Sequence, residues 1–247
     1  MPLFFTAPEN IKENEEHILI YGKEARHIIK SLRYKINDQI LVSDGQGNKY
    51  LSVIEDYKEQ ILKCKIISSI SPANEFKKTK IVLAQSLLKG NKIDLVIQKS
   101  TELGISSLIP LVSSRTIPAV GFLEGEKKQK RWQKIAYEAS KQSERSTVPK
   151  IYPITKFKEL LKDSQHFDLS LIFWEKERSV SLKEVMTSTP EPATILSVIG
   201  PEGGFSEEEV ELAKESGLKS VSLGSHYLRS ETAAIFVLSV ISYVFNL

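Results

Sequence analysis

The chain has 247 residues, a net charge of +3 and 41% hydrophobic residues, which is enough apolar material for one large domain or two modest ones. Its single cysteine, Cys64, excludes an internal disulfide, and its four dispersed histidines offer no zinc-binding spacing. The first ten residues lack the features of a signal peptide. The apolar stretch at 233–247 is shorter than the about 20 residues that a bilayer requires. We therefore expect a cytoplasmic protein without a membrane segment or a metal.

Positive charge is concentrated in the middle of the chain. Residues 76–150 contain 15 Lys and Arg against 6 Asp and Glu, for a net charge of +9. The flanking parts are acidic, with net charges of −1 for 1–75 and −5 for 151–247. A basic block of this kind is typical of a surface for a polyanion, nucleic acid first. An ordinary solvated surface is the alternative, and charge alone does not decide between the two.

The first 70 residues predict a small β-rich module. Apolar alternation predicts strands at 17–21, 39–43, 49–55 and 61–69. A helical pattern covers 22–32, and Asp-Gly-Gln-Gly at 44–47 is a strong hairpin signal. Several short strands of this kind suggest a small barrel. The segment 71–75 has the composition of a linker, so we place one domain at 1–71 and a second at 76–247.

Strands and helices alternate through the second domain. The predicted strands are 81–85, 106–111, 168–174, 195–199 and 220–223. The predicted helices are 93–103, 127–144, 156–162, 179–186, a segment between Ser206 and Gly217, and 231–245. This alternation predicts a mainly parallel sheet with helices on both faces. In the helix at 127–144, Trp132 falls on the apolar stripe, so we expect it in the core and not as a platform for stacking bases.

Two predicted strands near the C-terminus each end in a glycine-containing loop. Gly-Pro-Glu-Gly-Gly follows the first at 200–204, and Gly-Ser-His-Tyr-Leu-Arg follows the second at 224–229. Glycines permit backbone conformations that side chains forbid and leave amides accessible to a ligand. If the two strands are neighbours, both loops lie at the edge where parallel sheets bind ligands. Ser206 and Glu209 predict a capping box after the first loop, and Ser230 is predicted to cap the last helix.

These loops resemble a known family. The residues at 200–204, Leu-Gly at 223–224 and Leu-Arg-Ser-Glu-Thr-Ala at 228–233 closely resemble the RsmE family, ribosomal RNA uridine N3-methyltransferases of the SPOUT superfamily. Gln-Lys-Ser-Thr-Glu-Leu-Gly at 98–104 and the segment 27–33 are also similar to this family. The resemblance implies an α/β fold: a C-terminal methyltransferase domain with a mostly parallel sheet and a trefoil knot, after an N-terminal PUA-like β-barrel that binds RNA. It also implies S-adenosylmethionine as methyl donor, 16S ribosomal RNA within the 30S subunit as partner, and a homodimer packed through the knotted domain.

The resemblance also assigns site residues. Arg229 is expected to stabilise negative charge on the uracil carbonyls, and Glu231 or Glu202 to accept the N3 proton. The cofactor-binding residues are expected to be Leu196, Ile199, Gly200, Pro201, Gly203, Leu223, Gly224, Leu228, Thr232 and Ala233. The RNA-binding residues are expected to be Arg33, Lys99, Arg115, Arg131 and Arg145. Glu175 is a further site candidate, with a solvated turn carboxylate as the alternative. Leu3 stands where the family usually has a basic residue.

Two other functions are consistent with parts of the sequence pattern, and a third is disfavoured by it. A knotted ribose 2′-hydroxyl methyltransferase would be recognised by mass spectrometry of the digested product. A non-catalytic RNA-binding or ribosome-assembly protein need not bind the donor, which calorimetry would test. A nucleotide-dependent dehydrogenase is disfavoured, because 200–204 is not G-x-G-x-x-G and does not lie in a first βαβ unit.

Overall fold

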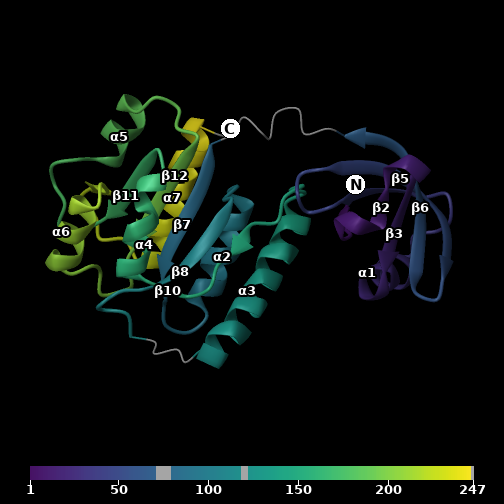
Figure 1. Cartoon of the computed structure of the whole chain (residues 1–247), viewed down its shortest axis with the longest axis horizontal. Coiled ribbons are helices and arrows are strands. Elements are labelled where there is room, and N and C mark those ends of the chain that lie inside the picture. Colours follow the sequence, from purple (N-terminus) through teal and green to yellow (C-terminus); the bar gives the residue numbers. More distant parts are fainter. Residues whose placement is uncertain (71–78, 118–121, 246–247) are drawn as a thin grey trace. The chain divides into compact units, whose positions relative to one another are not determined.

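The computed structural model describes residues 1–70, 79–117 and 122–245, so the linker predicted at 71–75 lies outside the described residues. The chain forms two compact units (Figure 1). The first comprises Met1–Phe76 with Ser140–Val148, and the second comprises Lys77–Ala139 with Pro149–Leu247. One of the boundaries between them therefore falls in the last turn of α3 (Phe122–Gln142). Among the described helices, none is long and apolar enough to span a membrane.

The first unit is built on a six-stranded sheet. Its strands are β1 (Leu3–Phe5), β2 (Ile11–Lys12), β3 (His17–Tyr21), β4 (Gln39–Ser43), β5 (Lys49–Lys58) and β6 (Ile61–Ile70). Their order is β1-β4-β5-β6-β3-β2, with β1 parallel to β4 and the other neighbours antiparallel. A short helix, α1 (Gly22–Arg26), continues as a π-helical turn over His27–Ser31. The predicted strands and helix are confirmed; β1 and β2 are too short to show a periodicity.

Side-chain burial explains why this sheet curls. Alternate residues of its strands, such as Ile18 and Ile20 on β3 and Ile40 and Val42 on β4, enter one common core. The Thr6 hydroxyl, just after β1, donates to the Leu19 carbonyl on β3 at 2.7 Å. Because β1 and β3 lie near opposite ends of the strand order, this bond joins the two edges of the sheet.

The segment 140–148 belongs to the first unit because the hairpin loop 44–47 holds it. The Ser146 carbonyl accepts hydrogen bonds from the Ser43 hydroxyl at 2.8 Å and from the Gly47 amide at 3.2 Å. Lys141 and Glu24, both largely buried, form an ion pair at 2.8 Å. These contacts give the end of α3 and the segment after it a structural role in the first unit.

The second unit is built on a seven-stranded sheet in which every described pair is parallel. Its strands are β7 (Lys80–Ser86), β8 (Ser107–Val112), β9 (Lys150–Ile151), β10 (Thr155–Lys156), β11 (Leu169–Phe173), β12 (Thr194–Ile199) and β13 (Lys219–Val221). Its helices are α2 (Lys92–Glu102), most of α3, α4 (Phe157–Asp163), α5 (Leu182–Ser188), α6 (Glu207–Glu215) and α7 (Ser230–Phe245). The order β10-β8-β7-β12-β11-β13, with β9 beside β8, confirms the predicted parallel sheet.

Two hydrophobic clusters show that helices cover both faces of this sheet. Along β12, Ile195 and Ile199 join the cluster under α2, α3, α5 and α7. Leu196 and Val198 join the cluster under α4 and α6. A strand buried on both faces reads as a continuous apolar run, which is why β12 was recognisable in the sequence.

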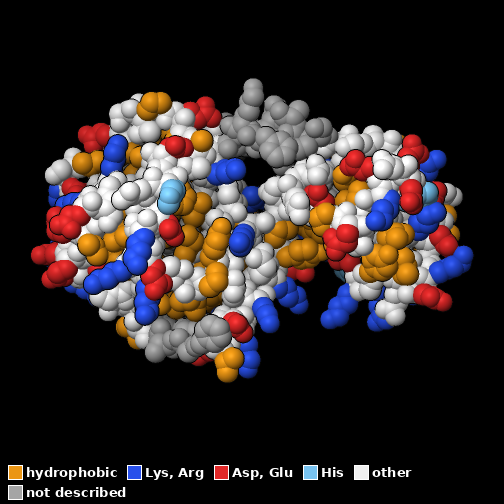
Figure 2. Space-filling model, viewed as in Figure 1, with side chains coloured by type: hydrophobic (Ala, Val, Ile, Leu, Met, Phe, Trp, Pro, Cys, Tyr) orange, Lys and Arg blue, Asp and Glu red, His pale blue; other side chains and the backbone are white. Residues whose placement is uncertain are grey.

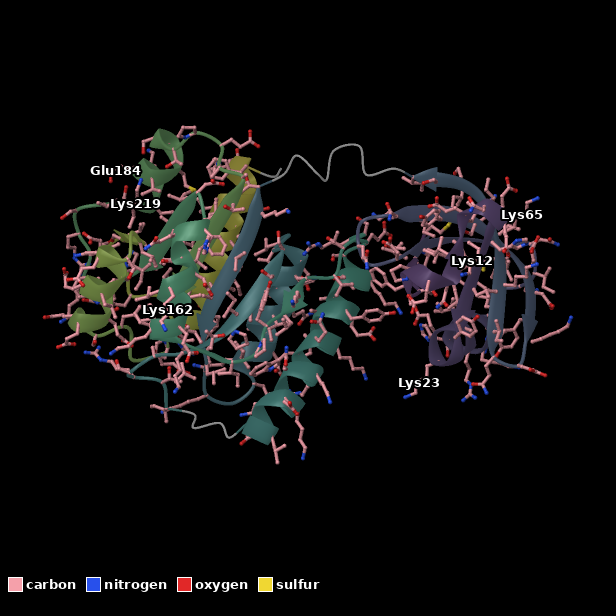
Figure 3. All side chains as sticks on the ribbon, viewed as in Figure 1. Lys12, Lys23, Lys65, Lys162, Glu184 and Lys219 are labelled. Atoms are coloured by element: carbon pink, nitrogen blue, oxygen red, sulfur yellow. The ribbon has the colours of Figure 1, made fainter. Side chains whose placement is uncertain are left out.

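Local capping fixes two of the helix starts. The Glu209 amide donates to the Ser206 hydroxyl at 3.2 Å and the Ser206 amide to the Glu209 carboxylate at 3.1 Å, which confirms the predicted capping box. Gly217, with φ at +89°, follows the end of α6 as predicted. Helix α5 starts at Leu182, whereas the sequence predicted a start at residue 179. The later start follows from a capping box that Ser181 forms with Glu184, which is labelled in Figure 3.

Trp132 of α3 is 2% exposed, which confirms its predicted place in the core.

Charged side chains are distributed unevenly over the second unit. On the outer side of α3, Lys127, Lys130 and Lys134 are exposed at i, i+3 and i+7, a basic stripe. Figure 2 shows acidic side chains over α6, where Glu207, Glu208, Glu211 and Glu215 are exposed.

Candidate active site

The three strands that end at the site are β12, β11 and β13. The strands β12 and β13 are not neighbours, contrary to the condition set in the sequence analysis, because β11 lies between them. Phe173 on β11 is in register with Ile199 on β12 and with Val221 on β13, and both pairings are parallel. All three strands therefore point the same way, and their following loops meet at one edge of the sheet.

A pocket of about 530 Å³ lies at this edge, within the size range of small-molecule sites. Eight of the ten expected cofactor-binding residues line it: Ile199, Gly200, Pro201, Gly203, Leu223, Gly224, Leu228 and Ala233. Arg229 and Glu175 line it as well. Leu196 does not line the pocket but lies fully buried in the core beneath α4 and α6, and Thr232 is exposed outside it.

The glycine loop 200–204 is shaped by close contacts that only glycine permits. Gly204 has φ at +67°, and a Cβ there would lie 2.6 Å from both carboxylate oxygens of Glu175. A Cβ at Gly200 would lie 3.2 Å from the ring of Phe205. Glu175, which follows β11, thus packs directly against the loop that follows β12.

Two flanking loops hold the glycine loop in place. The Glu202 carboxylate accepts hydrogen bonds from the Lys89 amide at 3.1 Å and from the Lys92 ammonium at 3.3 Å. The Arg115 guanidinium, expected to bind RNA, donates to the Gly203 carbonyl at 2.9 Å. The loop is therefore anchored on one side by the segment before α2 and on the other by the segment after β8.

These hydrogen bonds also decide the charge of Glu202. Burial alone would raise the pKa of its carboxyl, but hydrogen bonds from its own amide, from the Lys89 amide and from Lys92 outweigh it and hold the pKa below its ordinary value. A carboxylate that binds protons weakly is a poor general base at neutral pH. The contacts of the Glu202 carboxylate with Lys89 and Lys92 therefore fix the loop.

Lys92 connects the two pocket loops. Its ammonium lines the pocket and lies 3.3 Å from Glu202 and 3.4 Å from Glu231, which is in the first turn of α7. Glu231 itself does not line the pocket: its side chain is 12% exposed, and its second carboxylate oxygen is buried without a hydrogen-bond partner among the described residues. Sequence reasoning missed Lys92, because this first residue of α2 lies more than 100 positions before both loops in the chain.

A buried glutamine ties the same two loops to β7. The Gln85 side-chain amide, fully buried, donates to the Ser230 hydroxyl at 3.0 Å. That hydroxyl in turn donates to the Gly200 carbonyl at 2.5 Å. Ser230 was predicted to cap α7, and this prediction is wrong: it is the first helical residue, and its hydroxyl bonds to the neighbouring loop.

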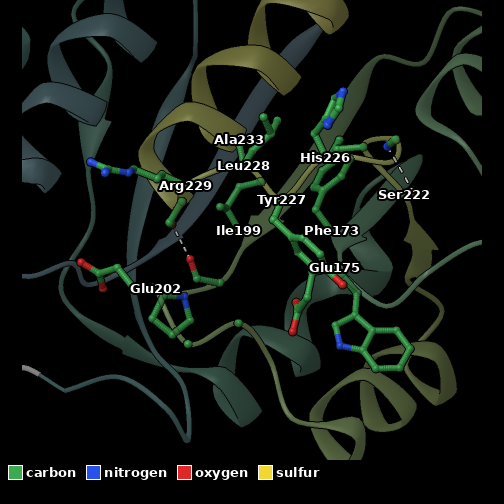
Figure 4. Close-up of a pocket in the computed structure, with 18 of the residues that line it drawn as sticks. Phe173, Glu175, Ile199, Glu202, Ser222, His226, Tyr227, Leu228, Arg229 and Ala233 are labelled. Atoms are coloured by element: carbon green, nitrogen blue, oxygen red, sulfur yellow. Dashed lines mark hydrogen bonds between the residues drawn. The ribbon is translucent and has the colours of Figure 1, made fainter.

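The second loop presents unused backbone donors and a cation. In the described part of the chain, the amides of Ser225, His226, Tyr227 and Leu228 donate to no protein acceptor. Figure 4 shows Arg229 at one side of the pocket and Glu175 at another. Apolar Ile199, Leu223 and Ala233 line the same cavity. Apolar walls with bare main-chain donors fit an adenosine-type cofactor such as S-adenosylmethionine.

The residues expected to bind RNA divide between the units. In the first unit, Arg33 is exposed and has no hydrogen bond or ion pair among the described residues, whereas Arg145 bonds to the Thr147 hydroxyl at 3.2 Å. In the second unit, Lys99 pairs with Glu102 and Arg131 with Asp94. Of the five residues, Arg33 thus has the guanidinium most available for a phosphate.

A parallel α/β unit with glycine loops around such a pocket, preceded by a curled β-rich unit, defines the class of RNA methyltransferases with a PUA domain. The sequence matches the family models of the RNA methyltransferase domain over residues 74–242 and of the RNA methyltransferase PUA domain over 20–67. The chain belongs to the ribosomal RNA small subunit methyltransferase E family.

Individual relatives agree with this assignment. The Bacillus subtilis protein named ribosomal RNA small subunit methyltransferase E is 34% identical over 91% of this chain and 89% of its own length. The Mesomycoplasma hyopneumoniae protein of that name is 34% identical over 93% of this chain and 96% of its own. The crystal structure of the Neisseria gonorrhoeae enzyme bound to S-adenosylmethionine is similar with a TM-score of 0.85 at 29% identity, and the match covers 99% of this chain and 98% of that one.

Proposed function

We propose that this protein transfers the methyl group of S-adenosylmethionine to N3 of a uridine in 16S ribosomal RNA, in the cytoplasm. The observation that carries the proposal is the pocket in which both glycine loops, the unused amides of the second loop and Arg229 meet. We further propose that the chain path through these loops forms the trefoil knot that the family resemblance implies.

The bound donor would supply an electrophilic methyl group, so the protein needs neither a metal nor a covalent intermediate. Uracil N3 is a poor nucleophile until it loses its proton, and negative charge then spreads over the carbonyl oxygens. The chain's own contribution is therefore to orient the base and to stabilise that charge.

We assign the electrostatic role to Arg229, because this residue lines the pocket and its guanidinium, which makes no hydrogen bond or ion pair within the described chain, lies at one side of it (Figure 4). Glu231 is proposed to act by holding Lys92 at the pocket, since its carboxylate pairs with that ammonium. A direct role for Glu231 as proton acceptor would require a different arrangement from the one seen. The cofactor would be held by the eight lining residues and by the amides of the second loop.

The RNA is proposed to lie along the basic stripe Lys127, Lys130 and Lys134 of α3 and to contact Arg33, Lys99, Arg115, Arg131 and Arg145. Ammonium groups spaced along one helix face release counterions from a phosphate backbone, so the affinity should fall steeply as salt rises. The acidic cover of α6 repels a polyanion and would keep RNA away from that part of the second unit.

The function is tested with 30S subunits that lack the modification. Incubation with the enzyme and a donor labelled in its methyl group is expected to label one uridine at N3, as read by mass spectrometry of digested RNA. Label on a ribose hydroxyl would favour the 2′-O-methyltransferase alternative. Binding of RNA without binding of the donor in calorimetry would favour a non-catalytic protein. Naked 16S RNA in parallel reactions shows which form is the substrate.

We also propose that the protein is a homodimer that packs through α7. Phe236, Tyr243 and Val244 are 43%, 75% and 43% exposed and, with Val240, fall at i, i+4, i+7 and i+8 on one side of this helix. An exposed apolar stripe of this kind is typical of an interface. Sedimentation at micromolar concentration should give twice the chain mass, and Tyr243→Glu should lower it; a monomeric wild-type protein would contradict the proposal.

A further inference from the structure

An aromatic ring stands at the mouth of the pocket without a partner in the chain. Tyr227 lines the pocket, yet its side chain is 76% exposed. Its hydroxyl makes no hydrogen bond among the described residues. Figure 4 shows the ring directed across the pocket toward Glu175. Isolated exposed apolar groups are ordinary on a surface, but a large ring at the opening of a ligand site is not explained by folding.

The loop that carries this ring is anchored at both ends. The Gly224 amide donates to the Ser222 hydroxyl at 3.3 Å, and the Ala233 amide donates to the Arg229 carbonyl at 2.8 Å. Ser230 is held by Gln85 and bonds to Gly200. Tyrosine has only two side-chain torsions, so an anchored loop presents the ring with little entropy left to lose on binding.

A base that is to be methylated on its Watson–Crick edge must first leave its stack, because pairing and stacking hide that edge. Proteins that accept such bases offset the loss of stacking with an aromatic side chain. Trp132 and Phe173 cannot serve from the core, since they are 2% and 7% exposed. Trp174 also lines the pocket but is partly buried. Tyr227 is exposed, faces the pocket and lies two residues before Arg229.

We propose that the ring of Tyr227 stacks on the target uracil and orients it in the pocket, an inference that rests on the proposed function. Ile199, Gly200, Leu223 and Ala233, which also line the pocket, would then contact the cofactor. The ring then contributes to recognition of the RNA and to orientation of the base, and it contributes little to cofactor binding.

Two substitutions separate stacking from the other properties of the side chain. Tyr227→Leu keeps an apolar group but removes the ring, and Tyr227→Phe keeps the ring but removes the hydroxyl. With unmodified 30S subunits as substrate, Tyr227→Leu should lower kcat/KM for the RNA roughly 5- to 150-fold, the range that loss of one base–aromatic stack produces. Tyr227→Phe should stay within about threefold of wild type, and the cofactor Kd of both variants should stay within about twofold.

Tyr152→Leu is the matched control, because Tyr152 is also an exposed tyrosine, 37% exposed, but does not line the pocket. It should retain wild-type kinetics, and thermal unfolding of the two Tyr227 variants should agree with that of wild type, since the Tyr227 ring is exposed. Unchanged kinetics in Tyr227→Leu would overturn the inference. An equal loss in cofactor affinity would assign the ring to the donor, and an equal loss in Tyr227→Phe would assign the effect to the hydroxyl; both overturn stacking. Wild-type enzyme that labels no uridine would refute the proposed function and the inference with it.

Discussion

Arg229→Ala is expected to lower kcat by about 10²- to 10³-fold, the effect of removing one preorganised group that stabilises developing negative charge. The cofactor Kd should change far less, because the expected cofactor contacts are apolar walls and main-chain amides, which this substitution leaves in place. Single-turnover kinetics with 30S subunits and calorimetry with the donor measure the two quantities separately.

Two further variants make this result interpretable. Arg229→Lys keeps the charge without the planar guanidinium and should retain part of the activity. Lys183→Ala removes an exposed cation of α5 that does not line the pocket, so it should behave as wild type. Equal losses in kcat and in cofactor affinity for Arg229→Ala would mean that the residue builds the pocket and does not act on the reacting base.

Gly204→Ala is expected to weaken cofactor binding at least tenfold and to destabilise the second unit. The φ of +67° makes a Cβ unfavourable by about 1–2 kcal/mol. For a chain of this size, that corresponds to a fall in Tm of about 2–8 °C. The added methyl would also lie 2.6 Å from the Glu175 carboxylate oxygens, so Glu175 must move within the pocket that it lines.

Gly217→Ala separates the two causes. Gly217 also has a positive φ, +89°, but a Cβ there would have no atom within 4 Å. It should lower the Tm without changing the cofactor Kd. The double variant Gly204→Ala with Glu175→Ala should lose less affinity than the sum of the single variants, because the contact between the two side chains is then absent. Additive losses would show that contact with Glu175 does not limit binding.

The carboxylates of the site show how far sequence reasoning reaches. The glycine-containing loops and the motifs that resemble the family identified the candidate site residues Arg229, Glu231, Glu202 and Glu175. The sequence offered no means to rank the carboxylates, since their charge and position depend on partners elsewhere in the chain. Hydrogen bonds from Lys89 and Lys92 hold the pKa of the Glu202 carboxyl below its ordinary value, and burial beside α2 takes Glu231 away from the pocket wall.

The sequence by itself determined the longer strands and the helices of both units, the parallel sheet with two covered faces and the location of the pocket loops. Hydrophobic periodicity records which face of each strand or helix is buried, and glycines record where the backbone must bend. Only the tertiary structure decided that β11 separates β12 from β13, that segment 140–148 joins the first unit and that Ser230 bonds to Gly200. These features depend on contacts such as Ser43 with Ser146 and Gln85 with Ser230, which lie 103 and 145 residues apart. Local patterns specify that a group is buried, but the partner that satisfies it is chosen when distant elements pack together.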